Sequence, residues 1–215
     1  MLKSHHKSSV QAVMQDAQET LLILGAGGHA QVVADAATQC GITALQFCDE
    51  GKGESLSEKA QNARYIHVAI GDNAQRLQGY RRAQECGLEP LSIIHPSAYI
   101  SSRAHVGAGV FVGAFCVINP RAFVKDYALI NTAAVIEHDC RVGNAAFVAP
   151  GAIMCGASEL GDRAFLGTHA TMIPETRLGA DAVAGAGATI VSNFDEKCCV
   201  VGTPARIKES GEPVE

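Results

Sequence analysis

From residue 94 onward, large aliphatic side chains recur at every sixth position without a break. Steps of six from Ile94 to Ile190 give seventeen positions, and only Ala184 among them lacks a large aliphatic side chain. A small residue, Ala, Ser, Thr or Cys, lies two residues before nearly all of them, the exception being Val110. This period suits a triangular coil in which each short strand forms one side and three sides complete a turn. The pattern predicts a hexapeptide-repeat parallel β-helix of about five turns, with no long loop leaving it.

Residues 21–93 alternate between strand-like and helix-like segments. The strand-like segments are TLLILGAGG, ALQFCDE and RYIHVAIGDN, and the helix-like segments are HAQVVADAATQCG and NAQRLQGYRRAQECG, which end at Gly41 and Gly87. Strand–helix–strand order predicts a small parallel sheet of about three strands. The expected organisation is an N-terminal extension (1–20), an α/β Rossmann-like half-domain (21–93), a β-helix (94–195) and a C-terminal tail (196–215).

Composition narrows the class of protein. Hydrophobic residues make up 47% and aromatic residues 5%, with 22 Gly and no Trp, which favours a core of small and branched side chains. A net charge of −5 and the lack of a basic run argue against nucleic acid as the main partner. No apolar run reaches the length of a membrane span and no signal core begins the chain, so we expect a soluble, cytoplasmic protein. The eight cysteines form no CxxC pair, and we expect them to be reduced packing residues.

The loop Gly25-Ala26-Gly27-Gly28-His29-Ala30 follows a predicted strand and opens a predicted helix. It fits Gly-x-Gly-x-x-Ala, in which glycines allow a tight turn and the helix N-terminus offers N–H groups to phosphate. Asp49, about twenty residues later, could accept a hydrogen bond from a ribose hydroxyl. These features alone favour a dinucleotide site, but about three strands are too few for a complete dinucleotide-binding fold. Gly71-Asp72-Asn73 is compatible with a place in the same pocket and with a strand-to-helix turn capped by Asn73, and the two interpretations do not exclude each other.

The stretch AAVIEHDCRVG places three titratable groups, Glu137, His138 and Asp139, inside the apolar repeat. In the phase of the repeat His138 lies two residues after the inward Ile136, so its side chain is predicted to point outward near a corner. Imidazole has an ordinary pKa of about 6.5 and suits a general base, and a neighbouring carboxylate can orient it. A solvated corner histidine is the alternative. Three further histidines are predicted surface residues without the converging spacing of a zinc site: His95, His105 and His169.

Several segments in combination resemble one enzyme family. They are LLILGAGGHAQVVADAA, FCDE, AIGDN, INTAAVIEHDCRVG and GAGATIVSNFDEKCCVVGTPARIK. Over about residues 20–208 the chain resembles the left-handed β-helix sugar acetyltransferases of the sialic-acid and bacillosamine pathways. The resemblance implies acetyl-CoA as co-substrate, no metal, and a homotrimer that completes its site across the subunit contact. It also implies N-acetylation of a UDP-linked 4-amino-4,6-dideoxy-N-acetylhexosamine for glycan biosynthesis.

The same resemblance implies roles for individual residues. His138 matches the general base and Asp139 the carboxylate that supports it. The residues that match the acceptor and nucleotide-sugar pocket are Gly27, Gly28, His29, Asp49, Glu50, Gly71, Asn131 and Glu137, and those that match the acetyl-CoA site are Phe147, Thr168 and Ala186. One position departs from the family, because Phe147 stands where a second histidine commonly contacts acetyl-CoA. An apolar ring there removes a polar contact with the cofactor.

Three other functions are compatible with parts of the sequence. O-acetylation of sialic acid is a rival in the same class, because the base does the same work for a hydroxyl as for an amine. An NAD-binding oxidoreductase is favoured by the glycine loop alone. A non-catalytic β-helix scaffold or sugar-nucleotide sensor would make the Glu-His-Asp cluster accidental.

Overall fold

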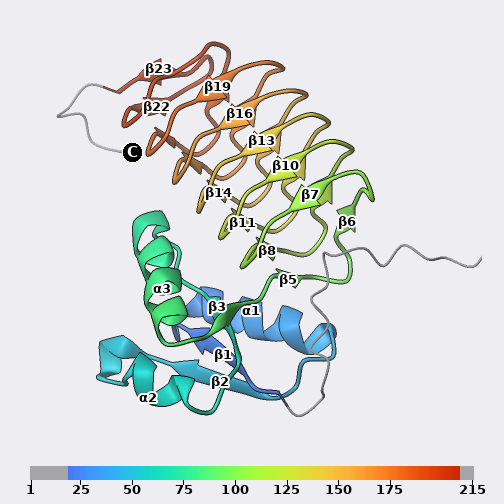
Figure 1. Ribbon diagram of the computed structural model, residues 1–215. Coiled ribbons are helices and arrows are strands. Elements are labelled where there is room, and N and C mark those ends of the chain that lie inside the picture. Colours follow the sequence, from blue (N-terminus) through green and yellow to red (C-terminus); the bar gives the residue numbers. More distant parts are fainter. Residues whose placement is uncertain (1–18, 209–215) are drawn as a thin grey trace, which may run out of the picture.

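The computed structural model describes residues 19–208, and two parts lie side by side in it: an α/β half and a β-helix (Figure 1). Most of the predicted N-terminal extension (1–18) and the end of the predicted tail (209–215) lie outside the described residues. No helix in residues 19–208 is long and apolar enough to cross a membrane.

The α/β half is built on a four-stranded parallel sheet in the order β2-β1-β3-β4. Its strands are β1 (Leu21–Leu24), β2 (Leu45–Cys48), β3 (Tyr65–Val68) and β4 (Glu89–Pro90). Strands β1 and β3 are buried on both faces, which suits the continuous apolar run of β1 and the mostly apolar β3, whose one polar residue is the buried His67. The sequence predicted three strands. The fourth, β4, was missed because two residues, one of them proline, carry no strand pattern, and proline is tolerated there at the sheet edge.

The helices of this half are α1 (Gly28–Gln39), α2 (Leu56–Ala60) and α3 (Asn73–Glu85), with the short 3-10 helix η1 (Glu50–Lys52) after β2. The two long helices end just before Gly41 and Gly87 as predicted, and both glycines have positive φ. The predicted cap of α3 was wrong by one residue. Asp72, rather than Asn73, caps the helix, and its carboxylate accepts from the Gln75 N–H at 2.8 Å. Helices α2 and η1 were not predicted.

The β-helix has three walls of short strands, and nearly all of these strands pair in parallel with the strand one 18-residue turn away. The C-terminal end of one wall departs from this rule, because Val183 pairs with Cys199 and the last strand, Arg206–Ile207, runs antiparallel. Wall 1 contains β5 (Ile93–Ile94), β8 (Phe111–Val112), β11 (Leu129–Ile130), β14 (Phe147–Val148), β17 (Phe165–Leu166), β20 (Val183–Ala184), β22 (Cys199–Val201) and β23 (Arg206–Ile207). Wall 2 contains β6 (Tyr99–Ile100), β9 (Val117–Ile118), β12 (Val135–Ile136), β15 (Ile153–Met154), β18 (Thr171–Met172) and β21 (Thr189–Ile190). Wall 3 contains β7 (His105–Val106), β10 (Phe123–Val124), β13 (Arg141–Val142), β16 (Glu159–Leu160) and β19 (Arg177–Leu178).

The predicted inward residues form the core of the β-helix. The aliphatic column from Val106 to Ile190 is buried, and so are the small residues two positions before most of its members. At the corners the residue three after the aliphatic has positive φ, for example Asp139 (63°), Ala145 (50°) and Arg163 (57°). This conformation is uncommon for residues other than glycine. Hydrogen bonds between successive turns accompany it, as from the Asp139 N–H to the Pro120 carbonyl at 3.3 Å.

The walls meet at three kinds of corner, named by the walls that they join. The 1–2 corner follows each wall-1 strand, the 2–3 corner each wall-2 strand and the 3–1 corner each wall-3 strand. In one turn these corners are residues 131–133, 137–139 and 143–145, respectively. The predicted site residues of the β-helix lie mostly at such corners.

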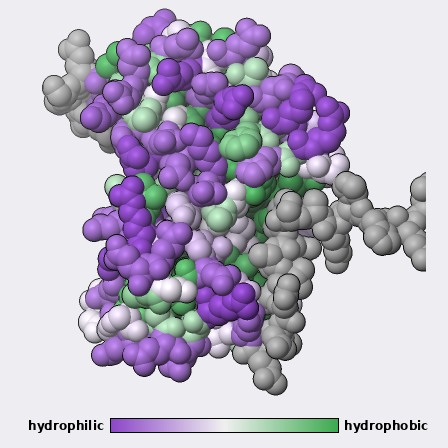
Figure 2. All heavy atoms as spheres, in the orientation of Figure 1, coloured by the Kyte–Doolittle hydropathy of each residue, from purple (hydrophilic) through white to green (hydrophobic). Residues whose placement is uncertain are grey.

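The α/β half is fixed on wall 1 and at the 3–1 corner. Phe111 and Leu129 of wall 1 are buried in one apolar cluster with residues of β1 and α1. Arg76 of α3 is fully buried, and its guanidinium donates to the carbonyls of Tyr127 at 3.0 Å and Ala145 at 2.7 Å, both at the 3–1 corner. The visible surface of both halves is largely hydrophilic, with apolar patches near their junction (Figure 2).

Candidate functional site

Glu137, His138 and Asp139 form a 2–3 corner between β12 and β13. The residues on either side, Ile136 and Cys140, are buried in the core and anchor this corner. The His138 side chain is 58% exposed and points outward, as the phase of the repeat predicted. The corner therefore presents an accessible imidazole on a rigid backbone.

The imidazole of His138 is paired with the neighbouring carboxylate. His138 Nδ1 lies 2.8 Å from Asp139 Oδ2. Arg121, one turn earlier, donates through Nε and Nη2 to the two oxygens of Asp139, each at 2.6 Å. The Arg121 guanidinium, and after it His138, hold the pKa of the Asp139 carboxyl well below its usual range. An ionised carboxylate can accept a hydrogen bond from Nδ1–H, and in that tautomer Nε2 is free to accept a proton from another molecule.

Gly156 lies against the other side of the ring, one turn after His138. A Cβ atom at this position would lie 2.6 Å from Cε1 and 2.8 Å from Nε2 of the imidazole. The φ of Gly156 is not in the left-handed region, so the glycine is needed here for space. Sequence reasoning missed Gly156. The available signal was its position 18 residues after His138, which in a β-helix means direct stacking.

The residues predicted around the acceptor sugar are divided between two corners. Glu137 precedes His138 at the 2–3 corner, and its carboxylate accepts from Asn119 Nδ2 at 2.9 Å. Asn131 lies at the 1–2 corner, where its side-chain oxygen accepts from the Thr132 N–H at 2.8 Å. One chain therefore does not bring Asn131 and Glu137 together, because the width of wall 2 separates their corners.

The residues predicted at acetyl-CoA lie on wall 1 and at the 1–2 corner. Thr168 and Ala186 are exposed and stacked one turn apart, and the Thr168 carbonyl accepts from the Gly187 N–H at 2.8 Å. Phe147 projects from wall 1, half-buried, with its ring edge-on to the Phe165 ring at 5.0 Å. The wall-1 strands lead into the 1–2 corner, so these residues share one side of the molecule, away from His138.

The residues predicted at the nucleotide sugar lie in the loops after β1, β2 and β3. The carboxyl ends of parallel strands meet at one edge of a sheet, which brings the Gly27-Gly28-His29 loop, Asp49 and Gly71 to the same edge. Asp49 caps η1 by accepting from the Gly51 N–H at 3.1 Å. The Glu50 carboxylate is engaged by Arg82 through two bonds of 2.7 Å. Gly27 and Gly28 are exposed.

His29 differs from the other residues of this edge because its ring is largely buried. The ring lies edge-on to Phe111 at 5.2 Å, and its Nε2 is buried without a hydrogen-bond partner among the described residues. Burial, and then the charge of Arg76, lower the pKa of His29 to about 4. The imidazole is therefore neutral near pH 7, with one unsatisfied polar atom beside the predicted nucleotide-sugar pocket.

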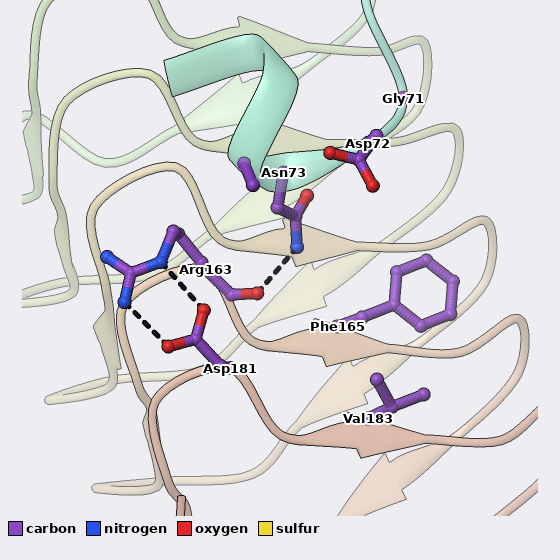
Figure 3. A pocket seen from close by; sticks show the side chains of 8 residues that line it. Gly71, Asp72, Asn73, Arg163, Phe165, Asp181 and Val183 are labelled. Atoms are coloured by element: carbon purple, nitrogen blue, oxygen red, sulfur yellow. Dashed lines mark hydrogen bonds and ion pairs between the residues drawn. The ribbon is translucent and has the colours of Figure 1, made fainter. Parts of the chain in front are cut away.

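A pocket of about 300 Å³ lies between the N-terminus of α3 and wall 1 (Figure 3). Its lining residues are Gly71, Asp72, Asn73, Ala74, Arg163, Phe165, Asp181 and Val183. Figure 3 shows the two-pronged contact of Arg163 with Asp181 and the bond from Asn73 Nδ2 to the Arg163 carbonyl, at 2.8 Å. Gly71 is the one predicted site residue in this lining, and the sequence offered Asp72 and Asn73 only as a possible part of that pocket or as a turn. The sequence did not indicate Ala74 or the lining residues of the β-helix.

The described residues offer no group of three or more His, Cys, Asp or Glu side chains that could hold a metal ion.

Comparison with known proteins connects this geometry to a family. Residues 20–83 match the family model described as the PglD N-terminal domain. GDP-perosamine N-acetyltransferase of Escherichia coli O157:H7 is 28% identical over 89 residues, and this match spans 41% of the chain and 40% of that relative. The chain thus matches well under two thirds of the length of this curated relative.

Solved structures are similar over nearly the whole chain. PerB from Caulobacter crescentus, in complex with CoA and GDP-perosamine, is 36% identical with a TM-score of 0.85, over 88% of this chain and 97% of that chain. The acetyltransferase domain of PglB from Neisseria gonorrhoeae FA1090, in complex with acetyl coenzyme A, is 32% identical with a TM-score of 0.83, over 89% of this chain and 100% of that domain. The protein therefore belongs to the family of sugar N-acetyltransferases in which an α/β half precedes a left-handed β-helix.

Proposed function

We propose that the protein transfers the acetyl group of acetyl-CoA to the amino group of a nucleotide-linked amino sugar, with His138 as general base. The observation that carries this proposal is the exposed His138 imidazole, held between Asp139 and Gly156 at a corner of the β-helix. Membership of the sugar N-acetyltransferase family supports the reaction class.

The geometry suits the proton transfer that this reaction needs. The amino nitrogen of the sugar attacks the thioester carbonyl, a C–N bond forms, and the C–S bond to CoA breaks. His138 Nε2 accepts the proton that the nitrogen loses, and the proton then passes to the CoA thiolate. The Asp139 carboxylate, 2.8 Å from Nδ1, stabilises the imidazolium formed between these steps. Amide and free CoA are the products.

The nucleotide part of the acceptor is proposed to bind at the edge formed by the Gly27-Gly28-His29 loop, Asp49 and Gly71. The N-cap residue of α1, Gly27, makes no side-chain hydrogen bond to the first N–H groups of the helix, and such groups suit a phosphate. The unsatisfied Nε2 of neutral His29 suits a hydrogen bond to the same ligand. We propose a UDP-linked 4-amino-4,6-dideoxy-N-acetylhexosamine as acceptor. The complexes of relatives with GDP-perosamine support a nucleotide-linked amino sugar and make the GDP form the first competitor to test.

Acetyl-CoA is proposed to lie along wall 1 and the 1–2 corner, near Phe147, Thr168 and Ala186. The complex of a relative with acetyl coenzyme A supports the cofactor. The exposed Ala186 leaves room for the pantetheine arm, so Ala186→Trp should raise the Michaelis constant for acetyl-CoA without unfolding the protein. An unchanged constant would remove position 186 from the cofactor site.

The distance between the two corners argues for a homotrimer. His138 and the proposed cofactor residues lie at opposite ends of wall 2, so a neighbouring copy is needed to bring them together. Wall 2 also presents an apolar outward stripe in register, Tyr99, Val117, Val135 and Ile153, of which Tyr99 is 58% and Ile153 37% exposed. Such a stripe suits burial against another subunit. Sedimentation at micromolar concentration should give the mass of three chains, and a stable monomer would contradict the shared site.

The cytoplasmic location of the protein stays a prediction.

One experiment tests the function directly. The full chain is incubated with acetyl-CoA and a panel of UDP- and GDP-linked amino sugars, with free sialic acids as the O-acetyl arm, and CoA release is followed with mass spectrometry of the products. We expect an N-acetylated nucleotide sugar, lost in His138→Ala. CoA release only with sialic acid would replace the proposed acceptor, and no acetyl transfer to any member would contradict the reaction class.

A further inference from the structure

Arg121 is the residue of the 2–3 corner for which neither the sequence nor the proposed chemistry has a role. It lies 18 residues before Asp139, and both residues occupy the left-handed corner position, with φ of 64° and 63°. Stacking of successive turns therefore places the two side chains in one column, and Arg121 is itself tied to the turn below by a bond from its N–H to the Arg103 carbonyl at 3.0 Å. The β-helix backbone thus brings the guanidinium to the carboxylate without a loop.

The contact fixes the direction of the Asp139 carboxylate. Arg121 Nε donates to Oδ1 and Nη2 donates to Oδ2, both at 2.6 Å, and the same Oδ2 accepts from His138 Nδ1 at 2.8 Å. The terminal torsion of an aspartate is broad, so a corner carboxylate bonded to a histidine alone would rotate. A planar guanidinium bound through two parallel bonds removes that freedom, which a single ammonium cannot do.

We propose that Arg121 is a positioning residue for the acetyl transfer: by clamping the Asp139 carboxylate in plane, it keeps the His138 proton on Nδ1 and the lone pair of Nε2 facing the acceptor. The proposal rests on the proposed function for its catalytic consequence, but its structural part concerns only the histidine. The other ionisable side chains of this corner column are Arg103, Glu137, Cys155 and Glu175, and His138 has no hydrogen bond to any of them.

The direct test is the tautomer of His138 in the full-length protein. With ¹⁵N-labelled histidine at alkaline pH, the nitrogen shifts distinguish Nδ1–H from Nε2–H, and His138→Gln identifies the resonances. In the wild type we expect the Nδ1–H form to dominate. In Arg121→Gln we expect the tautomer populations of His138 to move toward those of free histidine. We also expect kcat to be lower by about tenfold and the Michaelis constant for acetyl-CoA to stay within about twofold. Arg121→Lys keeps the charge but not the two parallel bonds, so it should restore only part of both.

The chain contains a matched control. Arg163 makes the same two-pronged contact with Asp181, at 2.7 and 2.6 Å, at a 3–1 corner without a histidine. Arg163→Gln should lower the thermal midpoint as much as Arg121→Gln and leave the His138 resonances unchanged. Persistence of the Nδ1–H form in Arg121→Gln would overturn the proposal, whatever the activity. Full acetyl transfer in His138→Gln would instead overturn the base of the proposed function, and the tautomer result would still decide the role of Arg121.

Discussion

The 2–3 corner and the 3–1 corner of the β-helix each contain a bidentate Arg–Asp ion pair, and the hydrogen bonds of the two pairs are nearly equal in length. Arg121 and Asp139 form it at the 2–3 corner, and Arg163 and Asp181 form it at the 3–1 corner. The surroundings of the two pairs differ. At the 3–1 corner α3 lies against the turns and donates to their carbonyls, whereas at the 2–3 corner the carboxylate also pairs with the exposed His138. The repeating β-helix thus forms the same Arg–Asp ion pair at two corners. The environment of each pair differs, because His138 adjoins one pair and α3 packs against the other.

The largest effect is expected from removing the histidine at the 2–3 corner. His138→Ala should lower kcat by about 10²–10⁴-fold, the usual contribution of a positioned general base. Substrate binding should change little, because the side chain acts on the proton lost in the transition state. Steady-state kinetics of CoA release measures this. Asp139→Asn should give a smaller loss than His138→Ala, and the reverse order would contradict the assigned roles.

Next in size is the loss of the docking contact at the 3–1 corner. Arg76→Met should lower the free energy of unfolding by about 2–4 kcal/mol, because the buried carbonyls of Tyr127, Ala145 and the Gly71 loop lose their donor. Denaturant unfolding measures the change. Arg81→Met, on the exposed face of the same helix, is the control and should change stability far less. Equal stability of the two variants would mean that Arg76 does not hold the two halves together.

A single methyl group at the 2–3 corner should have an intermediate catalytic effect. Gly156→Ala places a Cβ within 3 Å of His138 Cε1 and Nε2, so the ring must move, and we expect kcat to fall about 10–100-fold. The kcat of Gly156→Ala is measured in the wild type and in His138→Ala, which separates displacement of the His138 ring from a loss of activity that does not involve the ring. Once the imidazole is absent, in His138→Ala, the added methyl group should cost nothing further. Additive losses in the double variant would show that Gly156 acts independently of the ring.

The smallest effect is expected on acid stability, where the two corners should behave alike. Arg121 lowers the pKa of Asp139, and Arg163 lowers the pKa of Asp181. A carboxyl whose pKa is lower in the folded chain than its unfolded value of about 3.9 adds stability above that value, and this stability is lost as the pH falls toward the folded pKa. Asp139→Asn and Asp181→Asn should therefore both flatten the fall in unfolding free energy below about pH 4. Glu196 is an exposed acid that forms no ion pair with the residues from 19 to 208, and Glu196→Gln should leave that fall unchanged.

The fold of the β-helix could be predicted in detail because its period is repeated. Each inward position needs an aliphatic side chain, so the aliphatic residues from Ile94 to Ile190 mark where the strands lie. The phase of the same six-residue repeat placed His138 outward. The α/β half was predicted less completely. Its long strands and helices follow from burial and helical periodicity, but β4, α2 and η1 are too short to produce a pattern. The roles of the site residues stay predictions.

By itself the sequence determined the backbone columns of the β-helix, the parallel sheet and the outward histidine, because these depend on which positions are apolar and at what spacing. Only the tertiary structure decided which side chains meet. Gly156 beneath the imidazole, Arg121 on the Asp139 carboxylate and Arg76 between the two halves depend on side-chain torsions and on the docking of α3. A period of 18 residues aligns Cα atoms from turn to turn, but it does not fix where a long polar side chain ends, since hydrogen-bond partners from elsewhere in the chain compete for it.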